Sequence, residues 1–266
     1  MFRVAALIPS PLVLVPELAG GVPLNDPGHP AVRVPDLRES VLRAGRILRE
    51  QARHWAIVGA GTGPVPTGVG GFGGFGADVR VSLSAHEPDA EPDPAWPTAL
   101  LVGAWLRGRI AAEGAGTGGG EADDGETDDI EARAVPVDPD ADSGRCVELG
   151  ARLRACLDAD PNPQAVLVVA DGAATLSTTS PGYLDPRAAA YQRRIDDALD
   201  GGDRSALGEL DPHLCADLDI AGRPGYQVLA GLFGGDDADP KVETLYRGAP
   251  FGVGYHVSVW YPAGAR

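Results

Sequence analysis

Three polar residues follow apolar runs of the sequence, and their types could support chemistry. Ser10 comes just after the first run, Thr62 lies in the glycine-rich stretch after the second, and Asp171 directly follows a third. Open α/β sheets bind ligands beyond the carboxyl ends of their parallel strands, so all three are candidates for a pocket. If Asp171 is partly desolvated, it could act as a base or bind a hydrogen-bond donor of a ligand. Alternatively, Asp171 and Gly172 simply form a turn.

Glu17 adds a carboxylate near Ser10 in the sequence, but it could equally cap the segment that follows. A serine hydrolase built on Ser10 has little support. No G-x-S-x-G motif surrounds this serine, and no histidine is placed to activate it. The candidate pocket is therefore Ser10, Glu17, Thr62 and Asp171, and no catalytic residue is assigned.

The histidines do not form a metal-ligating pattern, because none pairs with another at a spacing of two or four residues. His54 begins an expected strand at the end opposite the candidate pocket. His256 lies within an expected C-terminal strand beside Tyr255, where a hydrogen-bonded core histidine is favoured over a metal ligand. The remaining three are expected in loops or at a helix start: His29, His86 and His213. The sequence predicts no metal site.

Composition excludes several classes of function. The 38 acidic residues outweigh the 22 basic ones, for a formal net charge of −16, which repels phosphate backbones and anionic lipid. Nucleic acids and membrane surfaces are therefore not expected as partners. Three widely spaced cysteines without a C-x-x-C pair suggest neither a disulfide framework nor zinc, and favour a reducing cytoplasm. Prolines interrupt the apolar stretch over residues 1–20, so we interpret it as strand and loop rather than a signal peptide.

Alternating apolar runs and amphipathic segments predict the elements that would position these residues. Strands are expected at 2–8, 54–58, 79–84, 130–137 and 165–170. Helices are expected at 36–50, 98–112, 143–157, 186–199, 205–210, 212–217 and 224–233. Asp185 should cap the helix that begins at Pro186. Two final strands, 242–247 and 252–261, should pair antiparallel. We therefore predict one three-layer αβα domain over residues 1–266, with a mostly parallel central sheet and antiparallel strands near the C-terminus.

Two glycine-rich segments do not indicate phosphate binding or a core. The stretch GVGGFGGFG at 68–76 has no following Lys-Ser/Thr and no helix behind it, so a flexible loop is expected. Residues 114–129 are acidic and almost free of apolar side chains. They predict a surface loop or a disordered insertion.

Three segments, taken in order, resemble the LigB-like superfamily. They are PSPLVLVPE at 9–17, VVADGAATLS at 168–177 with SPGYLDPRA at 180–188, and PFGVGY at 250–255. This superfamily includes catalytic subunits of class III extradiol ring-cleavage dioxygenases and Memo-type proteins, and the chain most resembles uncharacterised actinobacterial members. The resemblance spans nearly the whole chain. It implies an α/β fold in which Ser180 to Asp185 shape a loop and a helix entry.

Such a dioxygenase needs Fe(II) held by two histidines and a carboxylate, and a histidine as acid and base. In the family these histidines follow the first strand, the second strand and a later strand. Here Ser10 takes the first position, and neither the loop with Thr62 nor the one with Asp171 carries histidine. The resemblance thus predicts a protein without a cofactor that binds a small molecule, aromatic in keeping with the family, or another protein.

An active Fe(II) dioxygenase, or another metal-dependent enzyme with a rebuilt site, is the alternative. It would need His256 to converge with Asp171 or Glu17. Class III relatives commonly form dimers or larger oligomers, and an exposed C-terminal sheet edge could pair with a second copy. A homo-oligomer is therefore compatible with the sequence.

Overall fold

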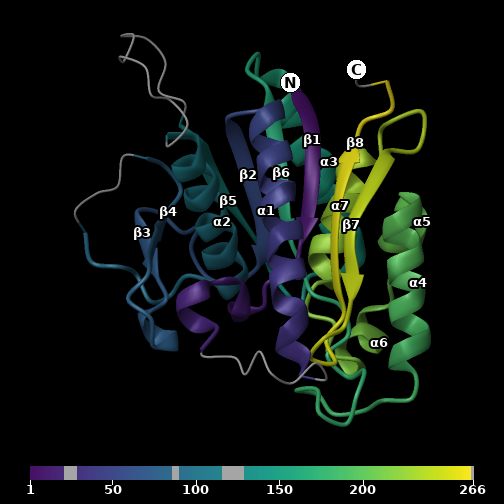
Figure 1. Cartoon of the computed structure of the whole chain (residues 1–266). Coiled ribbons are helices and arrows are strands. Elements are labelled where there is room, and N and C mark those ends of the chain that lie inside the picture. Colours follow the sequence, from purple (N-terminus) through teal and green to yellow (C-terminus); the bar gives the residue numbers. More distant parts are fainter. Residues whose placement is uncertain (21–28, 86–89, 116–128, 265–266) are drawn as a thin grey trace.

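A six-stranded sheet runs through the middle of the molecule (Figure 1). The structure is a computed structural model that describes residues 1–20, 29–85, 90–115 and 129–264. In spatial order the strands are β5 (Glu131–Val137), β2 (His54–Ala60), β6 (Gln164–Val169), β1 (Phe2–Ile8), β8 (Tyr255–Tyr261) and β7 (Lys241–Gly248). The first four are parallel, and β8 pairs antiparallel with both β1 and β7. The prediction of a mostly parallel sheet with antiparallel strands near the C-terminus is confirmed.

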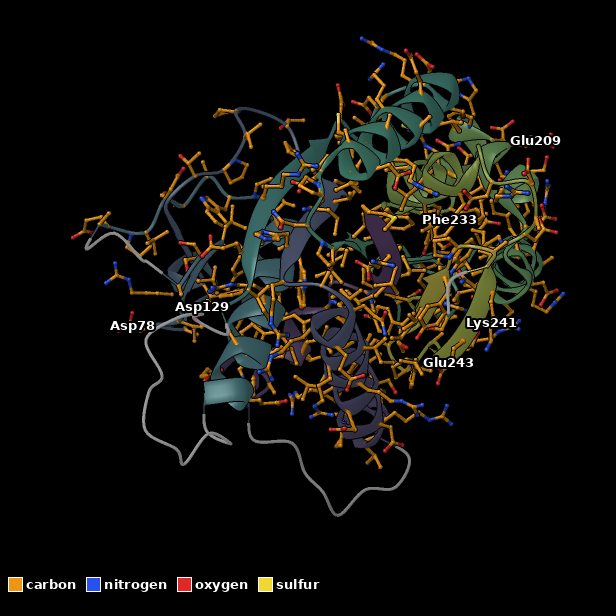
Figure 2. The ribbon with its side chains drawn as sticks, turned by 90° about the horizontal axis from the view of Figure 1, so that it is seen from above. Asp78, Asp129, Glu209, Phe233, Lys241 and Glu243 are labelled. Carbon is orange, nitrogen blue, oxygen red and sulfur yellow. The ribbon has the colours of Figure 1, made fainter. Side chains whose placement is uncertain are left out.

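Helices cover both faces of this sheet, as the view along the strands in Figure 2 shows. One layer contains α1 (Val34–Gln51) and α2 (Thr98–Ala115). The other contains α3 (Ser143–Ala159), α4 (Ala188–Gly201), α5 (Arg204–Gly208), α6 (Pro212–Asp217) and α7 (Arg223–Phe233). All six residues of β6 are buried, because a central parallel strand is covered on both sides. The predicted three-layer α/β architecture is therefore present.

Helices α3 and α7 approach so closely that their contact requires glycine. A Cβ atom added to Gly231 would overlap the Val147 carbonyl oxygen, and one added to Gly150 would overlap the Val228 carbonyl oxygen. Backbone therefore packs against backbone here, with no room for a methyl group. This contact fixes α7 above β2 and β6.

The expectation of a flexible loop at 68–76 is wrong in part. Residues Val69–Gly71 form β3, which pairs antiparallel with β4 (Arg80–Ser82), and a 3-10 turn follows at Gly73–Phe75. Gly70 lies under the Trp96 indole, where an added Cβ would sit 2.6 Å from the ring. The glycine thus makes room for a buried tryptophan, a reason that the local sequence does not reveal.

Two expected boundaries also differ. Helix α4 begins at Ala188 rather than at Pro186, because the Asp185 carboxylate accepts from the Arg187 N–H in a turn before the helix. Strand β8 begins at Tyr255 rather than 252, since Gly252 adopts a left-handed φ of 70° in the preceding turn. Residues 116–128 of the predicted acidic loop lie outside the described residues. No helix in the described ranges is long and apolar enough to cross a bilayer.

The glycine contact between α3 and α7 predicts an asymmetric result for two Gly→Ala changes. Gly231→Ala should lower the free energy of unfolding by about 1–3 kcal/mol through overpacking. Gly108→Ala is the matched control, because nothing lies within 4 Å of its added Cβ. It should raise that free energy by about 0.5–1 kcal/mol through helix propensity. Urea denaturation measures both, and equal effects would contradict the close contact.

Candidate functional site

Ser10 and Asp171 meet at the carboxyl end of the parallel strands. Ile8 pairs with Val169 across β1 and β6, so the segments leaving these strands run side by side. The Ser10 N–H donates to Asp171 Oδ1 at 2.9 Å, and the Ser10 hydroxyl donates to Asp171 Oδ2. Two residues separated by 161 positions thus form one unit, at the end of the sheet where both were expected.

The backbone around Asp171 is held from two sides. Its carbonyl accepts from the Gly222 N–H at 3.0 Å, just before α7, and the Gly172 N–H donates to the Gly254 carbonyl at 2.8 Å, just before β8. A Cβ on Gly222 would overlap the Asp171 carbonyl oxygen, so only glycine permits this approach. Both hydrogen bonds fix the position from which the carboxylate points.

The Asp171 carboxyl is electrostatically perturbed. Burial raises its pKa above the ordinary value, although the two hydrogen bonds from Ser10 act in the opposite direction. A carboxyl that gives up its proton reluctantly is suited to exchanging one with a bound group.

Two tyrosines complete what we call the Asp171 corner, defined as Ser10, Asp171, Tyr226 and Tyr255. Burial raises the pKa of both phenols, and the nearby Asp171 charge raises them further. Neither hydroxyl hydrogen-bonds to any residue in the described part of the chain, although Tyr226 is only 1% and Tyr255 only 5% exposed. Sequence reasoning missed both, since they lie on α7 and β8, far from Asp171 in the chain.

The other two candidates lie apart from this corner. Thr62 is exposed and follows Gly61, whose N–H donates to the Val137 carbonyl at the end of β5. Glu17 is exposed at the short 3-10 helix Pro16–Leu18, and its charge acts on Arg38. Neither forms a hydrogen bond with Ser10 or Asp171. The corner therefore retains two of the four predicted residues.

A polar network links the corner to α4. The Ala173 N–H donates to Gln192 Oε1 at 2.8 Å, and Gln192 Nε2 donates to Asp196 Oδ1 at 2.8 Å. Arg247 Nε then donates to Asp196 Oδ2 at 3.0 Å. Burial raises the pKa of Asp196, which Gln192 and Arg247 partly offset. A chain of charged and amide groups thus supports the loop after β6, in addition to the apolar packing of Ala173 and Ala174.

His256 belongs to this network and not to the Asp171 corner. Its Nε2 lies 2.9 Å from Asp200 Oδ1, and its ring is 1% exposed. Its Nδ1 is buried and has no partner among the residues that the structure describes. Burial lowers the pKa of His256 against the pull of Asp200. The convergence of His256 with Asp171 or Glu17 that a rebuilt metal site would need does not occur.

The remaining histidines are also away from the corner. His54 lies at the amino end of β2, as predicted. His29 accepts from the Ala31 N–H at the start of the 3-10 helix Pro30–Arg33, His213 is exposed in α6, and His86 lies outside the described residues. No group of three His, Cys, Asp or Glu side chains suited to a metal occurs within the described ranges. One carboxylate and three hydroxyls at the corner, with no imidazole among them, do not fit the donor set of a ferrous centre.

Comparison with known proteins adds little. No family model matches the chain, and no curated protein matches it. Among solved structures it is similar to uncharacterized protein JW3007 from Escherichia coli K12, at 16% sequence identity over 97% of this chain and 99% of that one, with a TM-score of 0.45. A similarity at this level carries no argument about activity.

Because the pKa of Asp171 is raised, replacing its carboxyl group with a neutral amide should change the stability of the protein in a pH-dependent way. The folded state binds this proton more tightly than the unfolded state, so stability is lost as pH rises from the ordinary pKa through the raised one. Asp171→Asn should therefore become more stable relative to the parent protein between pH 4 and pH 7. Each tenfold difference in proton affinity is worth about 1.4 kcal/mol. Urea denaturation across this range measures the difference, and an Asn variant that loses relative stability with rising pH would contradict it.

His256 should make the free energy of unfolding fall as the pH drops, whereas Asp171 makes it fall as the pH rises. Its lowered pKa means that the unfolded state takes up this proton first, so stability falls as pH drops through about 6.5, the ordinary histidine value. His256→Gln retains a partner for Asp200 but cannot titrate. The fall in unfolding free energy between pH 7 and pH 5 should be smaller in this variant. A fall as steep as in the parent protein would exclude His256 as its source.

Proposed function

We propose that this chain is a LigB-like protein that binds a small hydroxyl-bearing molecule at the Asp171 corner without using a metal. One observation carries the proposal: a buried carboxylate is held by Ser10 beside two phenols whose hydroxyls have no partner among the described residues. Hydrogen-bonding groups of this kind, left unpaired at the end of a parallel sheet, favour a ligand over a purely structural role.

The corner offers a defined set of interactions. Asp171 can accept a hydrogen bond from a ligand hydroxyl, and charge-assisted hydrogen bonds contribute about 1.5–3 kcal/mol. The hydroxyls of Tyr226 and Tyr255 can each donate to a ligand oxygen or accept from a ligand hydroxyl. A hydroxylated aromatic ring satisfies this set, and the resemblance to ring-cleaving relatives favours that class.

Iron chemistry is not part of the proposal. A ferrous dioxygenase site needs two imidazoles and a carboxylate on one ion. The corner has one carboxylate, and the histidine considered for a rebuilt site is bonded to Asp200. The side chains at the corner therefore support binding, and no oxidative step is assigned to them.

We also propose a cytoplasmic location and association of two copies through the sheet edge. Free cysteines and a net charge of −16 favour a cytoplasmic protein that does not bind nucleic acid. Strand β7 forms one edge of the sheet, where a second copy could pair. Association would leave the Asp171 corner in each copy unchanged, since that corner is built from β1, β6, α7 and β8.

Catechol tests the binding site directly. Calorimetric titration with EDTA present should detect binding, and Asp171→Asn should weaken it at least tenfold, as expected for the loss of a charge-assisted hydrogen bond. Asp237→Asn is the matched control, since Asp237 is exposed on the loop after α7 and should leave binding unchanged. Binding that disappears in EDTA and returns with Fe(II) would contradict the proposal. So would an affinity that Asp171→Asn does not alter.

A further inference from the structure

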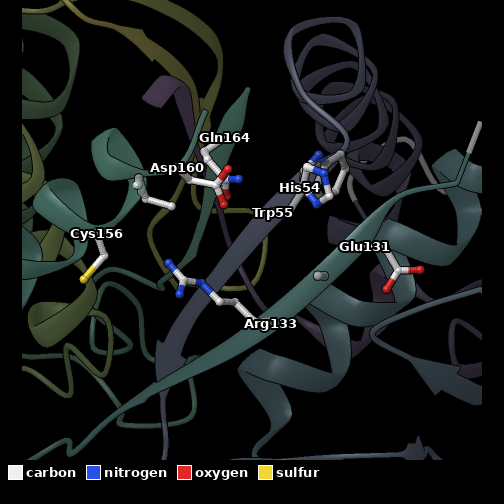
Figure 3. A pocket seen from close by; sticks show the side chains of 9 residues that line it. His54, Trp55, Glu131, Arg133, Cys156, Asp160 and Gln164 are labelled. Carbon is white, nitrogen blue, oxygen red and sulfur yellow. The ribbon is translucent and has the colours of Figure 1, made fainter. Parts of the chain in front are cut away.

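A second pocket lies at the opposite end of the same strands. It has a volume of about 260 Å³ (Figure 3). Its polar lining comes from the first residues of three parallel strands and from the end of α3: His54, Glu131, Arg133, Cys156, Asp160 and Gln164. We call it the amino-end pocket. It shares no residue with the Asp171 corner.

Strand register explains how the pocket forms. His54 pairs with both Glu131 and Gln164, so these three side chains stand in one row on the same face of the sheet. Further along the strands this face is covered by α3 and α7, but α3 ends at Ala159. The row is therefore left open at its amino end, beneath Asp160.

Gln164 shows that the pocket is more than a surface hollow. Gln164 is only 6% exposed, yet its side-chain amide makes no hydrogen bond to any residue that the structure describes. This side-chain amide lines the pocket and is not among the fully buried polar atoms that lack a partner. A buried amide normally has a partner. Gln164 therefore presents an NH2 group as donor and a carbonyl oxygen as acceptor to whatever enters.

Opposite charges line the same opening without neutralising each other. Arg133 comes from β5 and Asp160 caps the end of α3, and Figure 3 shows both around the opening with Gln164. No ion pair within 4.0 Å joins them or links either to another charged side chain in the described part of the chain. Asp160 Oδ1 accepts from the Asn162 N–H at 2.8 Å and the Met1 ammonium donates to the Asp160 carbonyl, so Asp160 Oδ2 is the oxygen left to face a ligand. A guanidinium recognises a carboxylate by paired hydrogen bonds, and a carboxylate recognises an ammonium.

We propose that the amino-end pocket binds a free α-amino acid. The ligand carboxylate would lie on Arg133, its ammonium on Asp160, and the Gln164 amide would hydrogen-bond between them. The α-carboxylate and α-ammonium of an amino acid are the two opposite charges, a few bonds apart, that this arrangement calls for.

Size and charge support this class. About 260 Å³ is below the range of roughly 300–1,000 Å³ of pockets for drug-sized ligands, so the occupant is small. A protein of net charge −16 repels a free anion at long range but not a neutral zwitterion. The nearby Glu131 also disfavours an occupant with only negative charge.

Cys156 provides a reporter at the rim of the pocket. It is the exposed cysteine of the three, since Cys146 and Cys215 are buried. Its reaction with a thiol reagent such as DTNB should slow at least threefold when L-alanine, L-glutamine or L-phenylalanine occupies the pocket. Calorimetric titration of the same amino acids measures the affinity independently of the thiol.

Matched ligands and variants make the test specific. N-acetyl-L-alanine lacks the ammonium and L-alaninamide lacks the carboxylate, and both should bind at least tenfold more weakly than L-alanine. Arg133→Gln and Asp160→Asn should each weaken L-amino acid binding at least tenfold, whereas Arg109→Gln, an exposed change on α2, should not. Asp171→Asn should also leave this binding intact, which separates it from the proposal for the Asp171 corner.

Three results would overturn the inference. The first is that none of the three amino acids binds by either measurement. The second is that acetate binds as well as L-alanine, which would make this a simple anion site. The third is an unchanged affinity in Arg133→Gln, with the variant shown to be folded by its unfolding transition.

Discussion

The parallel pairing of β1 with β6 is the constraint on which the rest of the structure depends. Burial on both faces fixes its register, because a slip of one residue would turn every apolar side chain of one strand to the wrong layer. That register places Ser10 against Asp171. The bonds from Gly222 and Gly254 then position α7 and β8, and with them Tyr226 and Tyr255, around the same carboxylate.

The Asp171 corner is maintained at a cost in stability. Burial raises the pKa of Asp171, so its charged form is disfavoured in the folded protein. The loop that carries it rests on Gln192 and Asp196, which are themselves buried polar groups. Proteins commonly retain such strain where a site needs unpaired polar groups. A purely structural turn after β6 would not require this arrangement.

The sequence predicts the frame better than the site. Apolar runs indicate the central strands because burial on both faces leaves a clear signal, but the pairing of β1 with β6 that brings Ser10 to Asp171 is evident only in the structure. Tyr226 and Tyr255 could not be predicted, since they reach the corner only through the tertiary placement of α7 and β8. The sequence suggests a flexible loop around Gly70, because the Trp96 indole that requires a glycine at this position lies further along the chain. The place of His54 at the amino ends was predictable, but the pocket there depends on where α3 ends.

We propose that the Asp171 corner binds its ligand without a metal. The most direct measurement is the content of iron, zinc and manganese per chain, determined by elemental analysis of untagged protein before and after anaerobic reconstitution with Fe(II). Our account predicts well under one metal ion per ten chains in both states, because the Asp171 corner supplies a single carboxylate and no imidazole. Close to one ion per chain after reconstitution, lost in Asp171→Asn, would contradict it.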